Sequence, residues 1–317
     1  MSSGPPVVVW GGGAVGCLFA GLLHRAGVPV TLVGRPNTVA AVRRDGIRVE
    51  GATEGIFRLP AETVLPSGTV ARAVFLTVKA FDVAPAAQQL AFSCPAPTPL
   101  LLPQNGLGIE KSTIPALISS GWARDSLPLV RGLNSIPSTL LGPGHVRHAG
   151  SGELILGPAA AASGGAAVAV FLDLCRAAGL PARATDDIER EVWRKLLVNA
   201  AINPVTADHH VLNGRLAEDP WRGQALALLH EALEVARAEG FAFSVEEAEG
   251  ELFRVVRATS SNRSSMLQDV DRGRPTEVEA ICGEISLRAH QHGIPVPQTD
   301  RILLRLRRRS SGDTPQP

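Results

Sequence analysis

Cysteine is scarce in this chain and follows no pattern. The four cysteines, Cys17, Cys94, Cys175 and Cys282, are scattered and include no C-x-x-C pair. Disulfide-stapled secreted domains and structural zinc sites both need cysteines at close, regular spacing. The sequence therefore argues against both classes. Cys17 and Cys282 fall in apolar helical contexts, where we expect the thiol to behave as a small apolar side chain.

An excess of charge of one sign and long apolar runs are also lacking. The chain carries 31 Lys and Arg against 30 Asp and Glu, a formal net charge of +1, which predicts neither a nucleic-acid surface nor an acidic tail. No apolar run approaches the roughly 20 residues of a membrane span, and the first residues lack the charged region of a signal peptide. We therefore expect a soluble, cytoplasmic protein. The single basic run, 305–309, is interpreted as a solvated helix end.

The first half of the sequence alternates short apolar segments with helical patterns. This alternation is typical of a parallel sheet covered by helices. The predicted central strands are 7–10, 28–33, 73–78 and 100–102, and the predicted helices are 14–26, 83–91 and 168–178. Shorter strands are predicted at 47–49 and 56–59, as a hairpin, at 146–148 and 153–156, with a glycine turn between them, and at the sheet edge at 182–184.

From residue 187 onward almost every segment has a helical pattern. The predicted helices are 187–203, 221–239, 245–258, 276–292 and 298–308, with Ser244 as the N-cap of the third. The sequence thus predicts an α/β Rossmann-type dinucleotide-binding domain over 1–184 and an all-α domain over 185–309, with the active site in the cleft between them. Residues 310–317 are predicted to be a disordered tail.

A glycine-rich turn follows the first predicted strand. The residues Gly11, Gly12, Gly13, Ala14, Val15 and Gly16 contain the pattern G-x-G-x-x-G and lead into the first predicted helix. The first glycine permits a tight turn, the second lets the backbone approach a pyrophosphate, and the third allows close helix–strand packing. A tight turn without a ligand is the alternative, but the strand–turn–helix context favours a dinucleotide bound at the helix N-terminus.

The end of the second predicted strand indicates which dinucleotide is bound. NAD-binding domains usually carry Asp or Glu there, where it accepts a hydrogen bond from the ribose 2′-OH. This chain has Arg35 instead, and a guanidinium suits a 2′-phosphate. Unless Arg35 is an ordinary surface residue, the sequence favours NADPH over NADH.

Two further loops follow predicted sheet strands, at the edge where open α/β sheets bind ligands. Lys79 ends the segment Thr77-Val78-Lys79, and Asn105 lies in Gln104-Asn105-Gly106. A solvated lysine and a turn asparagine are the alternatives. Their position at the carboxyl ends of strands favours a role in the site.

Three polar residues four positions apart lie on an otherwise apolar predicted helix. In a helix, residues four positions apart are rotated by only about 40° from one another about the helix axis. Lys195, Asn199 and Asn203 therefore form one polar line. A buried ammonium is costly unless a partner or a lowered pKa compensates it. The line could be a proton donor with two substrate-positioning amides, or a polar seam against a neighbouring helix. Pro204 is expected to end the helix.

A second polar segment lies at 259–279. It contains Ser264, Ser265, Glu277 and Glu279, which could be capping residues and first-turn carboxylates. By itself this segment does not decide between a structural and a functional role.

Taken in order, these motifs resemble the ketopantoate reductase (2-dehydropantoate 2-reductase) family. They are Gly-Gly-Gly-Ala-Val-Gly at 11–16, Thr-Val-Lys-Ala at 77–80, Gln-Asn-Gly at 104–106, Trp-Arg-Lys-Leu-Leu-Val-Asn-Ala-Ala-Ile-Asn-Pro-Val-Thr-Ala at 193–207, Ser-Ser-Met-Leu-Gln-Asp at 264–269 and Thr-Glu-Val-Glu at 276–279. The resemblance runs from about residue 6 to residue 308. Its later motifs are the specific ones, because the glycine loop is shared by many dehydrogenases.

The resemblance implies reduction of 2-dehydropantoate by NADPH, giving pantoate for pantothenate and coenzyme A biosynthesis. Lys195 matches the family's proton donor, and Asn199, Asn203 and Ser265 match substrate-binding residues. Asn105 matches a residue that touches both cofactor and substrate. Lys79 and Arg35 match cofactor contacts. Glu277 matches a carboxylate near cofactor and substrate that aids closure of the cleft.

One segment of the chain is loosely defined in the family pattern. It is 134–141, with Pro137 and Leu140-Leu141, and it does not specify the shape of the substrate pocket. Reduction of another branched 2-oxo acid and a catalytically silent NADP(H)-binding regulator are the alternatives. A homodimer is a further expectation. Asp208, His209 and His210 are consecutive and point in different directions, so we expect no metal site there.

Overall fold

The computed structural model describes residues 4–94, 97–159 and 164–310. Residues 311–317, which make up nearly all of the predicted tail, lie outside this range, and Ser310 ends the last helix. The described chain divides into two compact units. The first holds the residues up to Gln104 together with Ile109–Ile188, and the second holds Asn105–Gly108 together with the residues from Glu189 on.

The first unit is built on a predominantly parallel sheet. Among the described residues this sheet has eight strands in the order β12-β11-β8-β7-β6-β1-β2-β5, and only the β8–β11 pair is antiparallel. The strands are β1 (Val7–Trp10), β2 (Val30–Val33), β5 (Ala61–Glu62), β6 (Ala73–Leu76), β7 (Leu100–Leu102), β8 (Leu129–Asn134), β11 (Leu154–Pro158) and β12 (Ala182–Ala184). The order runs outward from β1 in both directions, which is the doubly wound topology expected from the alternating sequence.

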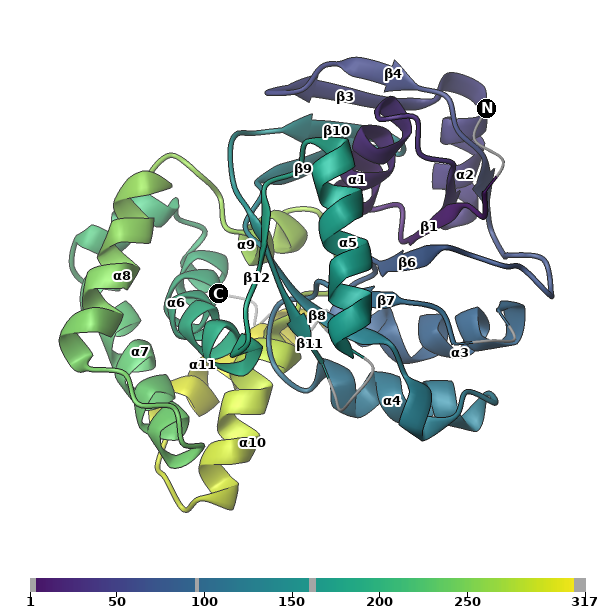
Figure 1. Ribbon diagram of the computed structural model, residues 1–317. Helices are drawn as coiled ribbons and strands as arrows, with labels where there is room; N and C mark the ends of the chain where they lie inside the picture. The colour runs from purple at the N-terminus through teal and green to yellow at the C-terminus, as the bar shows by residue number, and fades with distance from the viewer. Residues whose placement is uncertain (1–3, 95–96, 160–163, 311–317) are drawn as a thin grey trace. The chain divides into compact units, whose positions relative to one another are not determined.

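Helices cover both faces of this sheet (Figure 1). Successive side chains of a strand point to opposite faces, so Val7 and Val9 of β1 join one core cluster with α1 (Ala14–Arg25) and α5 (Gly164–Ala178). Val8 and Trp10 join the other cluster, with α3 (Val83–Ser93) and α4 (Ile109–Ser119). A strand covered on both faces reads as a continuous apolar run, which is why Val-Val-Val-Trp is recognisable in the sequence.

A smaller sheet completes the first unit. It has the order β4-β3-β10-β9 among the described residues, formed by β3 (Ile47–Gly51), β4 (Gly55–Phe57), β9 (Ser138–Gly142) and β10 (His145–His148). The predicted hairpin of β3 and β4 is present. The predicted strands at 146–148 and 153–156 also form, as β10 and β11, but they belong to different sheets. The open segment 134–141 runs from the end of β8 into β9.

The second unit is helical. Its described elements are α6 (Ile188–His209), α7 (Trp221–Ala238), α8 (Val245–Ala258), α9 (Ser265–Val270), the π-helix η4 (Glu279–Gly283), α10 (Glu284–Gln291), α11 (Pro297–Ser310) and the 3₁₀ turn η3 (Asn213–Ala217). Ser244 caps α8 as predicted, in a capping box with Glu247. In the part of the chain that the structure describes, no helix has both the length and the apolar character needed to cross a membrane.

One predicted helix end was wrong, and three helices were not predicted. Helix α6 does not end at Asn203 but continues through Pro204 to His209, because Pro204 and its neighbours are buried and packing outweighs one lost backbone hydrogen bond. The predicted helix 276–292 forms, as the π-helix η4 continued without a break by α10. Helices α2 (Pro36–Asp45), α4 and α9 were not predicted. Proline at the first helical position, as in α2, is compatible with a helix, but Pro115 inside α4 disguises the pattern.

Candidate functional site

The glycine turn between β1 and α1 has the geometry that the sequence predicts. Gly11 has φ +128°, and a Cβ there would lie 2.7 Å from the backbone of Thr77. A Cβ on Gly16 would lie 1.8 Å from the carbonyl oxygen of Gly11, so helix and turn are in direct contact. A Cβ on Gly12 would meet Thr38 at 2.6 Å. Three of the turn's four glycines are therefore required by close packing within the protein.

Gly13 differs from the other three glycines of this turn. No heavy atom among the described residues lies within 4 Å of where its Cβ would be, and no side chain caps the N-terminus of α1, which begins at Ala14. The turn therefore presents open space next to unsatisfied backbone N–H groups, the arrangement that accepts a pyrophosphate. The residues present fit a dinucleotide. Ala14 and Val15, partly buried, pack against the core from the first turn of the helix.

Two polar side chains that the sequence did not single out hold this edge of the sheet in place. The Thr77 hydroxyl donates to the carbonyl oxygen of Gly11 at 2.9 Å. The Gln104 amide donates to the carbonyl oxygens of Leu76 at 2.5 Å and Val78 at 3.0 Å. Both residues lie in the Thr-Val-Lys and Gln-Asn-Gly motifs, which was the available signal. They join the glycine turn and the loop after β6 to the sheet.

A buried arginine that was not predicted supports the neighbouring strands. Arg131 on β8 is 1% exposed; its guanidinium donates to the Leu102 carbonyl oxygen at 3.0 Å and pairs with Glu110 at 3.1 Å. Because β7 ends at Leu102, this contact fixes the point where the Gln-Asn-Gly loop leaves the sheet. A single arginine between apolar residues carries no recognisable pattern.

Arg35 and Lys79 follow neighbouring parts of the sheet edge. Arg35 directly precedes α2, after β2, and Lys79 precedes the 3₁₀ turn η1 (Ala80–Asp82), after β6. The guanidinium of Arg35 is 79% exposed and donates to the carboxylate of Asp82 at 3.0 Å. The structure thus places both predicted cofactor residues at the same edge as the glycine turn, and gives Arg35 an acidic partner that was not predicted.

In the second unit, the polar line lies on α6 as predicted. Lys195 and Asn199 are half-buried, and Asn203 is buried at 6% exposure. Most other side chains of the helix are buried, among them Trp193, which is 1% exposed and lies tilted against Phe241 at 5.9 Å between ring centroids, whereas Arg194 is exposed. The line therefore becomes more buried from Lys195 toward Asn203.

Ser265 is held near the Asn203 end of this line by its neighbour. Ser264 accepts a hydrogen bond from the backbone of Leu267 as the N-cap of α9, and its hydroxyl lies 2.6 Å from that of Thr206. Since Thr206 is three residues after Asn203 on α6, this bond fixes the start of α9 beside α6. Ser264 is a capping residue, as the structural alternative held, whereas the exposed Ser265 begins the helix.

Asn105 and Glu277, 172 residues apart, are in contact. The Asn105 amide donates to the Glu277 carboxylate at 3.2 Å, and Glu277 is buried at 7% exposure. The loop is docked on η4 as well: the Leu107 backbone donates to the carbonyl oxygen of Ala280 at 2.9 Å. Glu279, in contrast, is exposed and paired with Arg307. The two carboxylates thus differ in burial and in partner, a difference that was not predicted.

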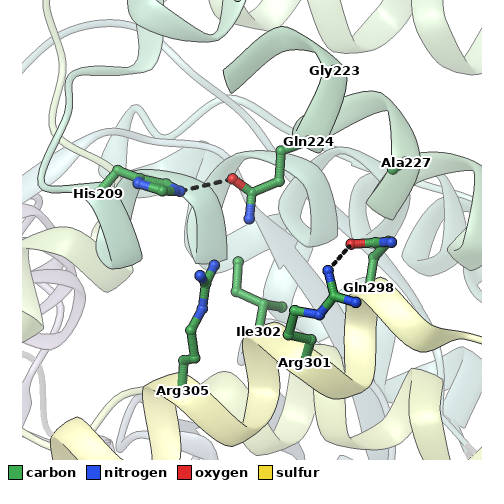
Figure 2. Close-up of a pocket in the computed structure, with 8 residues that line it drawn as sticks. All are labelled: His209, Gly223, Gln224, Ala227, Gln298, Arg301, Ile302 and Arg305. Atoms are coloured by element: carbon green, nitrogen blue, oxygen red, sulfur yellow. Dashed lines mark hydrogen bonds between the residues drawn. The ribbon is translucent and has the colours of Figure 1, made fainter. Parts of the chain in front are cut away.

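The helical unit also has a cavity of about 370 Å³ among the end of α6, α7 and α11 (Figure 2). It is lined by His209, Gly223, Gln224, Ala227, Gln298, Arg301, Ile302 and Arg305. None of these is a predicted site residue. Beside it, the buried Asp208 pairs with Arg305 and Arg309, so the basic run is more than a solvated helix end.

These features define a protein with an N-terminal α/β unit of the Rossmann, dinucleotide-binding type and a C-terminal helical unit. The family described as "Ketopantoate reductase PanE/ApbA" matches residues 7–161, and "Ketopantoate reductase PanE/ApbA C terminal" matches residues 187–310. The chain belongs to the ketopantoate reductase family.

Individual relatives agree with this assignment. A 2-dehydropantoate 2-reductase of Archaeoglobus fulgidus is 36% identical over 301 residues, covering 95% of this chain and 96% of that protein. The crystal structure of a PanE/ApbA family ketopantoate reductase from Ralstonia eutropha JMP134 aligns with TM-score 0.83 at 28% identity, over 97% and 99% of the two chains. A D-mandelate dehydrogenase solved with NADH and anilino(oxo)acetate aligns with TM-score 0.88 over 97% and 98%, and at 23% identity it shares the fold.

Proposed function

We propose that this protein catalyses the NADPH-dependent reduction of 2-dehydropantoate to pantoate, a step in pantothenate biosynthesis. The observation that carries the proposal is the polar line on α6, where one amine and two amides lie on one side of a helix whose remaining residues are mostly buried and apolar. The A. fulgidus relative, which is named 2-dehydropantoate 2-reductase, supports the choice of substrate.

Lys195 is suited to be the acid of this reaction. Addition of a hydride to a ketone builds negative charge on the oxygen, and a nearby ammonium both stabilises that charge and delivers the proton. NADPH, when bound, supplies the hydride to C2. Lysine can release a proton at a pH where arginine cannot. The chain has only three lysines among its 31 Lys and Arg residues. Position 195 is thus one of the few basic positions that carry lysine and not arginine.

The amides and hydroxyl near Lys195 would hold the substrate. Asn199 and Asn203 extend along α6 away from the lysine, and Ser265 begins the helix fixed beside α6 by the Thr206–Ser264 bond. These neutral groups can donate to a carboxylate and accept from a hydroxyl without adding charge. We assign Asn105 to contact with both cofactor and substrate, in an orientation held by Glu277.

Apart from Asn105, the residues that would hold the cofactor in this proposal belong to the first unit. The turn Gly11–Gly16 would hold the pyrophosphate, with Lys79 as a further contact and Arg35 at the 2′-phosphate. Residues 1–184 would then form the cofactor domain, and residues 185–309 the substrate and catalytic domain.

Steady-state kinetics with NADPH and a panel of 2-oxo acids test the proposal. We expect the highest kcat/KM with 2-dehydropantoate. A higher value with another branched 2-oxo acid would reassign the substrate while keeping the reaction. If the protein bound NADPH but turned over none of the acids, it would instead be a binding protein that retains the fold.

A further inference from the structure

We propose that Asp82 sets the balance between NADPH and NADH, acting as a carboxylate at the ribose 2′ position that reaches the site from the β6 loop. The inference rests on the proposed function, in which the dinucleotide binds at the glycine turn. The end of β2 carries Arg35 and no carboxylate, so the acid at this position comes from a different strand end.

The geometry brings the acid to the arginine from a different strand. Asp82 lies 47 residues after Arg35 in the chain, yet their side chains meet at 3.0 Å. Strands β2 and β6 both pair with β1 in parallel, so the loops that follow them flank the glycine turn. Arg35 is 79% exposed and Asp82 39% exposed, so both groups remain open to a ligand.

A purely local role for Asp82 is disfavoured by its hydrogen bonds. Asp82 is the N-cap residue of α3, a position where Asp usually accepts a bond from the first helical turn. Here its side chain makes no capping hydrogen bond in the described structure. The carboxylate is directed to Arg35 instead. Replacing Asp82 by Asn therefore removes a charge without removing a helix cap.

The pair would affect the two cofactors in opposite ways. A 2′-phosphate competes with Asp82 for the donors of Arg35 and is repelled by the carboxylate at short range. A 2′-hydroxyl can instead donate a hydrogen bond to that carboxylate, as it does to the acid found in NAD-binding domains. Arg35 thus favours NADPH, while Asp82 limits that preference and supports NADH.

Equilibrium binding of each dinucleotide, followed by the quenching of intrinsic tryptophan fluorescence, tests this inference independently of turnover. In Asp82→Asn we expect the ratio of the Kd for NADH to the Kd for NADPH to rise by about tenfold or more, the effect of one charge-assisted hydrogen bond. Asp82→Ala should shift it in the same direction. In Arg35→Gln the ratio should fall.

A control is Asp45→Asn, since Asp45 also pairs with an exposed arginine, Arg44 at 2.7 Å, but at the other end of α2. Its ratio should equal that of the wild type. An unchanged ratio in both Asp82 variants would overturn the inference while leaving the proposed reduction intact. Failure of the wild type to bind either dinucleotide would overturn the proposed function and the inference together.

Discussion

Lysine and arginine have different uses in this chain. Of the three lysines, Lys79 and Lys195 are in the proposed site, whereas Lys111 is exposed on α4. Arginines such as Arg131 and Arg305 form ion pairs instead, for which a permanently charged, planar group is well suited. A general acid needs a group that can release a proton, and the ammonium of Lys195 is such a group. It lies on a helix of mostly buried apolar residues.

Replacing Lys195 should affect chemistry more than binding. In Lys195→Ala we expect kcat to fall by roughly 10²–10⁴-fold, the range for loss of a general acid, while the Kd for NADPH stays near the wild-type value. Single-turnover kinetics and fluorescence titration measure the two quantities. Lys111→Ala is the matched control, with unchanged kcat. Wild-type turnover in Lys195→Ala would remove the lysine from the mechanism.

At the scale of elements, the turn between β1 and α1 depends on how close the two elements lie. The Thr77 hydroxyl bonds to the Gly11 carbonyl oxygen, and Gly16 brings the first turn of α1 against the same oxygen. This contact aims the N-terminus of α1 toward the open space at Gly13. The cofactor site is thus a product of helix–strand packing as much as of the residues that would touch the ligand.

A methyl group at Gly16 should disrupt this packing. Because its Cβ would lie 1.8 Å from the Gly11 carbonyl oxygen, Gly16→Ala must displace α1, and we expect a loss of about 1–3 kcal/mol in the free energy of unfolding. Weaker NADPH binding should accompany it. Denaturant unfolding and fluorescence titration measure the two effects.

The control for this variant is Gly165→Ala, a helical glycine of α5 with no described atom within 4 Å of the added Cβ. It should be neutral or slightly stabilising, since alanine favours a helix. Equal destabilisation by the two substitutions would mean that Gly16 matters only through helix propensity.

At the scale of the whole molecule, the four cysteines are distributed over both units, so their reactivity measures the unfolding of each. Cys17, Cys94 and Cys175 are buried in the first unit and Cys282 in the second. Burial raises the pKa of Cys17, Cys175 and Cys282 to about 12 and that of Cys94 to about 11. The folded protein therefore holds these thiols protonated and out of reach of solvent.

At pH 8 the native protein should not react with Ellman's reagent, and four thiols should react after unfolding in guanidinium. Each thiol has a higher pKa in the folded protein than its ordinary value of 9.0. The contribution of the thiols to the free energy of unfolding is therefore complete below pH 9. It is lost as the pH rises toward 11–12. The Cys282→Ala variant leaves thiols only in the first unit, so its reaction follows the opening of that unit alone. Rapid reaction of the native wild type would contradict the burial described here.

The sequence alone determined the main elements of this protein. Strand β1, the glycine turn and the polar line on α6 are local patterns, each legible within a few residues because strand and helix periodicity are properties of neighbouring positions. The motifs in order also placed the chain in its family, which the matches over 7–161 and 187–310 confirm. Roles of single site residues stay predictions that the experiments above address.

Only the tertiary structure decided which distant residues meet. The contacts Arg35–Asp82, Asn105–Glu277 and Thr206–Ser264 join positions 47, 172 and 58 residues apart, and no periodicity of either segment encodes them. Packing likewise carried α6 past Pro204 against the local preference of proline. Local pattern fixes the conformation of a segment, whereas the pairing of charges and amides depends on the sheet order and helix packing that bring those segments together.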